Sequence, residues 1–195
     1  RLSQPTELLL LPTGPGQPRV LPRGPVREYH WACFFPDGKR VLLVGNEEGR
    51  ATRLFVQPVE GGAPRAVTPE GTWTETNTIT PDGRFGLITR AGFKKLAYVD
   101  LTGLAPALLA GGTKVANGAF GITVTLDGTK ALVTNKTGGT LSVVDLTGLP
   151  VVPGPAAVTT LAVGDTLVAS LPAVEVIGSR EVTLADAAKH ADPQG

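Results

Sequence analysis

The chain is poor in the residues that carry most metal and redox chemistry. Its 195 residues include one cysteine, Cys33, two histidines, His30 and His190, and no methionine. One cysteine excludes an intrachain disulfide, and two histidines exclude a multi-histidine metal site within one chain. Nucleophile-elbow, phosphate-loop and dinucleotide-binding motifs are absent as well. We therefore predict no catalytic residue, no metal and no cofactor.

Strong charge of one sign and long apolar runs are also missing. The 18 basic and 17 acidic residues nearly cancel, and no stretch gathers five like charges, so a nucleic-acid partner is not expected. The apolar run at residues 8–11 is far shorter than the ~20 residues that span a bilayer, and no signal-peptide pattern precedes it. We expect no membrane partner. The absence of methionine, at position 1 included, indicates a processed, truncated or engineered product.

Glycine and proline are plentiful, and they divide the chain into short apolar runs. The 25 glycines and 17 prolines make up about a fifth of the residues. Asp37, Asp82 and Asp127 each precede a glycine and lie 45 residues apart. An Asp-Gly pair fits a tight turn because glycine accepts positive φ and aspartate bonds its own local backbone. The spacing predicts three repeated hairpins, pairing residues 31–35 with 41–44, 76–80 with 87–89, and 121–125 with 131–134.

A second hairpin follows in each repeat. Its first strand is predicted at 54–56, 96–99 and 141–144, each followed by a glycine-containing turn. The offset from Leu54 to Leu96 is 42 residues instead of 45. We assign the difference of three residues to the connection 46–52, because an exposed hairpin loop tolerates a change of length.

Together the two hairpins predict an all-β fold, a β-propeller of four-stranded antiparallel blades with about four blade-equivalents. Residues 8–11 match residues 54–57, so the chain is expected to begin halfway through a blade. Strands at 166–173 and 174–184 would complete that blade. The predicted units are 1–24 as the second half of a shared blade, 25–70, 71–115 and 116–163 as blades, and 164–195 as possible closing strands and tail.

Two sets of motifs resemble bacterial propeller repeats. The sequences FPDGKR at 35–40 and GGAPR at 61–65 are similar to the TolB-type repeat, over residues 31–69. LVTN at 132–135 resembles the YVTN-type repeat, over residues 77–148, with leucine replacing tyrosine. Such propellers usually close with six to eight blades. With about four blade-equivalents, the chain either forms an unusually small propeller that closes alone or associates with another copy, and we favour association as a dimer. The resemblance also implies a bacterial periplasmic or extracellular location.

One set of residues recurs at the start of the blades. His30, Glu75 and Phe120 share the 45-residue spacing, and His30 is expected just before a strand, where propeller loops face the central funnel. An imidazole beside a carboxylate can begin an acid/base or metal site, although we favour the simpler interpretation of His30 and Glu75 as ordinary solvated loop residues. With Trp31 and Asn77 these residues form the predicted ligand-binding set.

Aromatic residues cluster around the first blade. Tyr29, Trp31, Phe34, Phe35 and Trp73 lie in or just after it, and we expect core packing between blades to be their main role.

Three functions remain as alternatives. The first is a non-catalytic binding or scaffold module that takes a protein, peptide or small ligand. The second is a lactonase-like or other hydrolase that uses the central funnel, which requires acidic or histidine side chains from several blades to converge. The third is an engineered or recombined fragment without an evolved activity.

Overall fold

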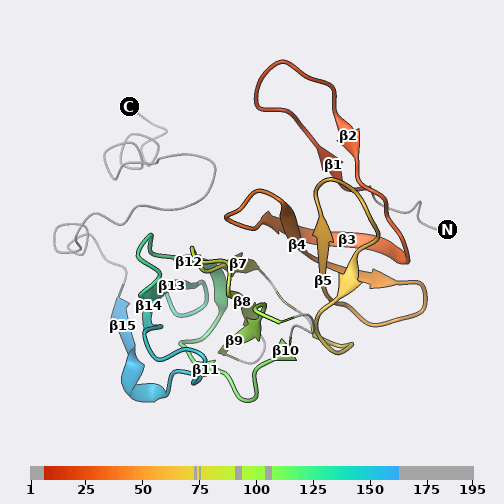
Figure 1. Cartoon of the computed structure of the whole chain (residues 1–195). Coiled ribbons are helices and arrows are strands. Elements are labelled where there is room, and N and C mark those ends of the chain that lie inside the picture. Colours follow the sequence, from red (N-terminus) through yellow and green to blue (C-terminus); the bar gives the residue numbers. More distant parts are fainter. Residues whose placement is uncertain (1–6, 73, 75, 91–93, 104–106, 163–195) are drawn as a thin grey trace, which may run out of the picture.

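The computed structural model describes residues 7–72, 74, 76–90, 94–103 and 107–162. These residues form four antiparallel sheets, linked by turns, loops and one turn of 3₁₀ helix, η2 (Pro155–Ala157). The predicted all-β fold is confirmed. The closing strands and tail predicted at 164–195 lie outside the described residues. Figure 1 shows the three larger sheets following one another along the chain, with a small hairpin at one end.

Each sheet comes from one continuous stretch of chain. The N-terminal hairpin consists of β1 (Leu9–Leu10) and β2 (Arg19–Val20). The first blade consists of β3 (Val26–Phe34), β4 (Arg40–Glu47), β5 (Arg53–Pro58) and β6 (Arg65–Ala66). The middle blade consists of β7 (Asn77–Ile79), β8 (Phe85–Arg90), β9 (Lys95–Asp100), β10 (Ala107–Leu108) and β11 (Thr113–Lys114), the last two both pairing with β9. The last blade consists of β12 (Ala119–Val124), β13 (Lys130–Asn135), β14 (Thr140–Asp145) and β15 (Val158–Ala162).

The three Asp-Gly turns close the hairpins that they predict. In the first turn the N–H of Phe35 donates to the carbonyl of Arg40 at 2.8 Å, and the Asp37 carboxylate accepts the N–H of Lys39 at 2.8 Å. Gly38 has a φ of 66°, which a residue with a Cβ adopts only with strain. Both the carbonyl and the carboxylate bonds recur at the turns of the middle and last blades.

The length difference between repeats lies in the predicted loop. Across the connection from β4 to β5, Gly45 pairs with Arg53, whereas Asn135 pairs with Thr140 at the equivalent place in the last blade. The first loop is therefore three residues longer, and the strands on both sides keep their register.

Neighbouring blades bury their faces against each other. Leu42 and Leu54 of the first blade share a core with Ile88 and Val99 of the middle blade. A second core joins Leu87 and Tyr98 of the middle blade to Val133 and Val144 of the last. A third joins Val41 and Phe55 of the first blade to the N-terminal hairpin. Each blade thus has a face toward the preceding unit and a face toward the following one, and each fully buried leucine or valine contributes roughly 1.5–3 kcal/mol.

The inner strands β3, β7 and β12 stand side by side, since β7 contacts both of the others. Each is the first strand of its blade and pairs only with the second. One boundary prediction is wrong. Strand β3 begins at Val26, not at residue 31, because its first residues pair with the end of β4 at Glu47. His30 therefore lies within the strand instead of in the loop before it.

Candidate binding surface on the inner strands

His30 occupies a β-bulge in β3. Tyr29 pairs with Gly45 and Trp31 pairs with Val44, so His30 is an extra residue without a counterpart on β4. A bulge redirects a side chain and bends its strand, and bulges are frequent beside functional sites. The imidazole is exposed, and its Nε2 lies 3.0 Å from Oδ1 of Asn46. This contact fixes the ring at the edge of the first blade.

Phe120 occupies the equivalent bulge in β12. Ala119 pairs with Asn135 and the next regular pair is Ile122 with Val133, so Phe120 and Gly121 oppose one residue. The carbonyl of Phe120 accepts hydrogen bonds from the hydroxyls of Thr76, at 2.6 Å, and Thr89, at 2.7 Å, in the middle blade. The backbone is therefore fixed to the neighbouring blade, while 46% of the side chain is exposed.

Asn77 joins the first and middle blades. It is buried, and its Oδ1 accepts the thiol of Cys33 at 2.9 Å. Its Nδ2 has no hydrogen-bond partner among the residues that the structure describes. Burial raises the pKa of Cys33 to about 12, so the thiol stays protonated and donates this bond at neutral pH. Asn77 thus lies beneath the inner surface, between two blades.

The predicted ligand-binding set is therefore arranged in two layers. His30, Trp31 and Phe120 are exposed on the inner strands, Trp31 with 48% of its surface accessible, whereas Asn77 lies buried between β3 and β7. Glu75 lies outside the described residues. Its place in the repeat is the one that His30 and Phe120 fill with bulges.

The prediction that the aromatic residues of the first blade pack in the core is only partly right. Phe35 is buried between blades, but Trp31 is exposed and Phe34 is 57% exposed. Phe34 pairs with Val41, whose side chain faces the N-terminal hairpin, so Phe34 lies on that side of the blade. Trp73 lies outside the described residues. Phe34 and Phe35 are consecutive in the predicted strand 31–35, and side chains alternate between the two faces of a strand, so the sequence already indicated that only one of them faces the core.

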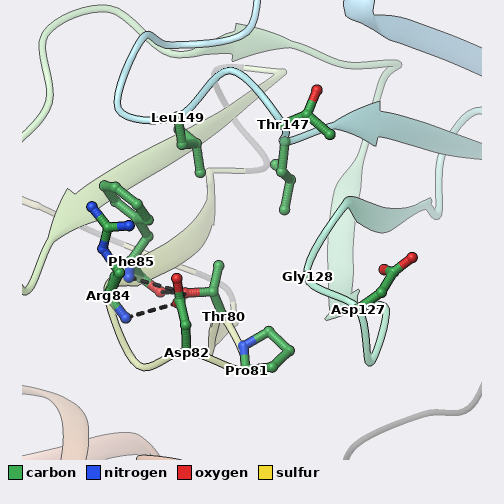
Figure 2. Close-up of a pocket in the computed structure, with 10 residues that line it drawn as sticks. Thr80, Pro81, Asp82, Arg84, Phe85, Asp127, Gly128, Thr147 and Leu149 are labelled. Atoms are coloured by element: carbon green, nitrogen blue, oxygen red, sulfur yellow. Dashed lines mark hydrogen bonds between the residues drawn. The ribbon is translucent and has the colours of Figure 1, made fainter.

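A cavity of about 450 Å³ lies between the Asp-Gly turns of the middle and last blades. The sequence predicted only a turn role for Asp82 and Asp127 and did not predict a pocket. Figure 2 shows Asp82 beside Thr80 and Arg84, and Asp127 apart from them beyond Gly128. The lining residues are Thr80, Pro81, Asp82, Arg84, Phe85, Asp127, Gly128, Leu146, Thr147 and Leu149.

The carboxylates of this cavity are already engaged by their own turns. The Thr80 hydroxyl donates to Asp82 at 2.6 Å, as does the Thr125 hydroxyl to Asp127 at 2.5 Å. The bonds from Thr125 and Thr129 hold the pKa of Asp127 below its ordinary value. In the described part of the chain, no three histidine, cysteine, aspartate or glutamate side chains gather closely enough to bind a metal ion.

None of the described helical structure is long and apolar enough to cross a membrane. No protein-family model matches the sequence, and no curated protein matches it either. Solved structures do match. The chain resembles TolB from Agrobacterium tumefaciens, with 17% identity and a TM-score of 0.53 over 79% of this chain and 53% of that one. The chain also resembles TolB from Acinetobacter baumannii, with 18% identity and a TM-score of 0.52 over 73% of this chain and 35% of that one.

The periplasmic gluconolactonase of Pseudomonas aeruginosa gives 14% identity and a TM-score of 0.53, over 83% of this chain and 48% of that one. The fold is a β-propeller. At these identities the likeness establishes the fold alone, and the chain spans about a third to a half of the length of these three propellers. The inner strands β3, β7 and β12 are thus the innermost strands of three consecutive propeller blades.

Proposed function

We propose that the chain is a non-catalytic binding module, which holds a polypeptide segment against its inner strands. The observation that carries this proposal is the recurrence of a bulge at His30 and Phe120, 90 residues apart, with both side chains exposed. Trp31 adds a third exposed ring beside His30. Exposed aromatic side chains on a rigid framework are typical centres of protein–protein binding energy.

The position of these residues supports the proposal, because packing of further blades does not cover innermost strands. Phe120 has its backbone tied to the middle blade through Thr76 and Thr89, so its ring is presented from a fixed support. Lys136 Nζ lies 5.8 Å from the centre of that ring. A peptide with aromatic or acidic side chains fits this combination of rings and a cation.

The test is selection of a phage-displayed random peptide library against the full chain. We expect the selected peptides to bind Trp31→Ala and Phe120→Ala at least about 30-fold more weakly, which corresponds to the ~2 kcal/mol of a hot-spot residue. Leu126→Ala is the matched control, because Leu126 is equally exposed, at 47%, but lies in an Asp-Gly turn. Failure to select any peptide, or equal binding by all four proteins, contradicts the proposal.

Lactone hydrolysis is the second candidate. The likeness to a protein described as a gluconolactonase, and an exposed imidazole at His30, favour it. Acid release from gluconolactone by the full chain, abolished in His30→Ala, would establish this function in place of peptide binding. The neighbour described as a periplasmic gluconolactonase also supports a bacterial periplasmic or extracellular location for this chain.

A further inference from the structure

The last blade leaves its following face without a neighbour among the described residues. Leu132, Leu141 and Val143 point to this face, because their equivalents Leu87, Leu96 and Tyr98 face the last blade from the middle one. Those three equivalents are 0% exposed, whereas Leu132, Leu141 and Val143 are each partly exposed. Leu161 joins them through its pairing with Leu141. We name Leu132, Leu141, Val143 and Leu161 the C-terminal end face.

The N-terminal hairpin exposes an apolar face on the side directed away from the first blade. Leu8 and Leu10 pack on the first blade, so Leu9 and Leu11 point away from it, and Val20 pairs with Leu9. Leu9, Leu11 and Val20 are 49%, 68% and 50% exposed. We name these three residues the N-terminal end face.

The two end faces match the two sides of an ordinary contact between blades. Where the first and middle blades meet, Leu54 and Val56 on β5 pack against Ala97 and Val99 on β9. In the repeat, Leu141 and Val143 on β14 correspond to Leu54 and Val56. Leu9 on β1, and Leu11 just after that strand, correspond to Ala97 and Val99.

The C-terminal end face therefore corresponds to one side of a contact between blades, and the N-terminal end face corresponds to the other side. Figure 1 shows the N-terminal hairpin and the last blade at opposite ends of the described structure, so one chain does not bring its own two end faces together. The matched part of this chain covers 53% and 48% of two of the propeller proteins that it resembles, so two copies of that part have about the length of one such protein.

We propose that the C-terminal end face of one chain packs on the N-terminal end face of a second copy of this chain, and that two such contacts close a dimeric ring. Each contact joins two different surfaces, and the ring closes with two copies when one chain is related to the other by a half turn. Exposed apolar faces of this kind are typical of association sites.

The test is sedimentation velocity of the full chain over a wide concentration range. We expect a dimer, and we expect Leu9→Lys and Leu141→Lys each to raise its dissociation constant at least tenfold, because each places a charge in an apolar contact. The double variant Leu9→Glu with Leu141→Lys restores much of the dimer by pairing the two charges. Val151→Lys is the matched control, because Val151 is 75% exposed in a loop outside both end faces.

A second measurement distinguishes two chains from one. In a Cys33→Ser background, cysteines at positions 9 and 141 are linked with a bismaleimide and separated by denaturing electrophoresis. Links between two chains support the proposal. Links within one chain overturn it, as do a strictly monomeric protein and a dimer that Leu9→Lys and Leu141→Lys both leave unchanged. Peptide binding through Trp31 and Phe120 is measured separately, so failure of either proposal does not decide the other.

Discussion

A comparison of the middle and last blades shows that the burial of equivalent residues depends on the neighbouring unit. Leu87 and Leu132 occupy the same place in the repeat, and both face the following unit. Leu87 is 0% exposed because the last blade covers it, whereas Leu132 remains partly exposed. The repeat therefore specifies which face each side chain joins, but burial depends on whether another unit is present on that side.

The largest expected effect compares these two leucines directly. We expect Leu87→Ala to lower the free energy of unfolding by about 2–5 kcal/mol, the cost of a cavity in a packed core. Leu132→Ala should cost about 1 kcal/mol or less when urea unfolding is measured at high dilution. A destabilisation by Leu132→Ala that grows with protein concentration would show that a second chain covers Leu132. Equal destabilisation by Leu87→Ala and Leu132→Ala at every concentration would contradict the difference in burial between the two leucines.

The next effect concerns hydroxyl groups at equivalent positions. Thr89 is fully buried, and its hydroxyl accepts the N–H of Thr76 at 3.2 Å and donates to the Phe120 carbonyl. Thr89→Val leaves that buried N–H unpaired, and we expect a loss of about 1–3 kcal/mol. Thr134 accepts the N–H of Gly121 at 2.9 Å but is exposed, so water replaces its hydroxyl in Thr134→Val. Losses of equal size in urea unfolding would contradict this account.

The smallest effect is a pH dependence that the two blades share. Asp100 and Asp145 accept hydrogen bonds from the side chain and backbone of Thr102 and Thr147, which lower the pKa of both carboxylates. A lowered pKa stabilises the fold above the unfolded value of about 3.9, and this contribution is lost as the pH falls through the folded pKa. Asp100→Asn and Asp145→Asn should therefore flatten the acid branch of the stability profile equally. Unequal flattening, measured by urea midpoints between pH 5 and 3, would show that the blades differ here too.

The sequence predicted the blades because their signals are local. Each Asp-Gly turn needs only a glycine with positive φ and an aspartate that bonds the next backbone amides, so the turns at Asp37, Asp82 and Asp127 follow from short stretches of chain. The three-residue difference in loop length could be placed for the same reason, because strands on both sides had to keep their register.

The candidate site depended on features that short patterns do not encode. The bulges at His30 and Phe120 arise from how two strands pair, and the sequence instead placed His30 in a loop. The burial of Asn77 depends on Cys33, which lies 44 residues away on another blade. The cavity between the turns of the middle and last blades likewise depends on the spacing of two units. Such features require the contact between blades as well as the pattern within one.

The strictly sequential arrangement of the sheets also shapes how the chain folds. Each sheet is built from one continuous stretch of chain, and all its strand pairs join neighbours along the chain except β9 with β11. Each core in the described structure joins two consecutive units. Stability in such an array is close to a sum of unit terms and nearest-neighbour terms, so structure can spread from the middle blade in both directions. Hydrogen exchange should consequently be slowest in β8 and β9, which have a neighbour on each face, and fastest toward the two ends of the array.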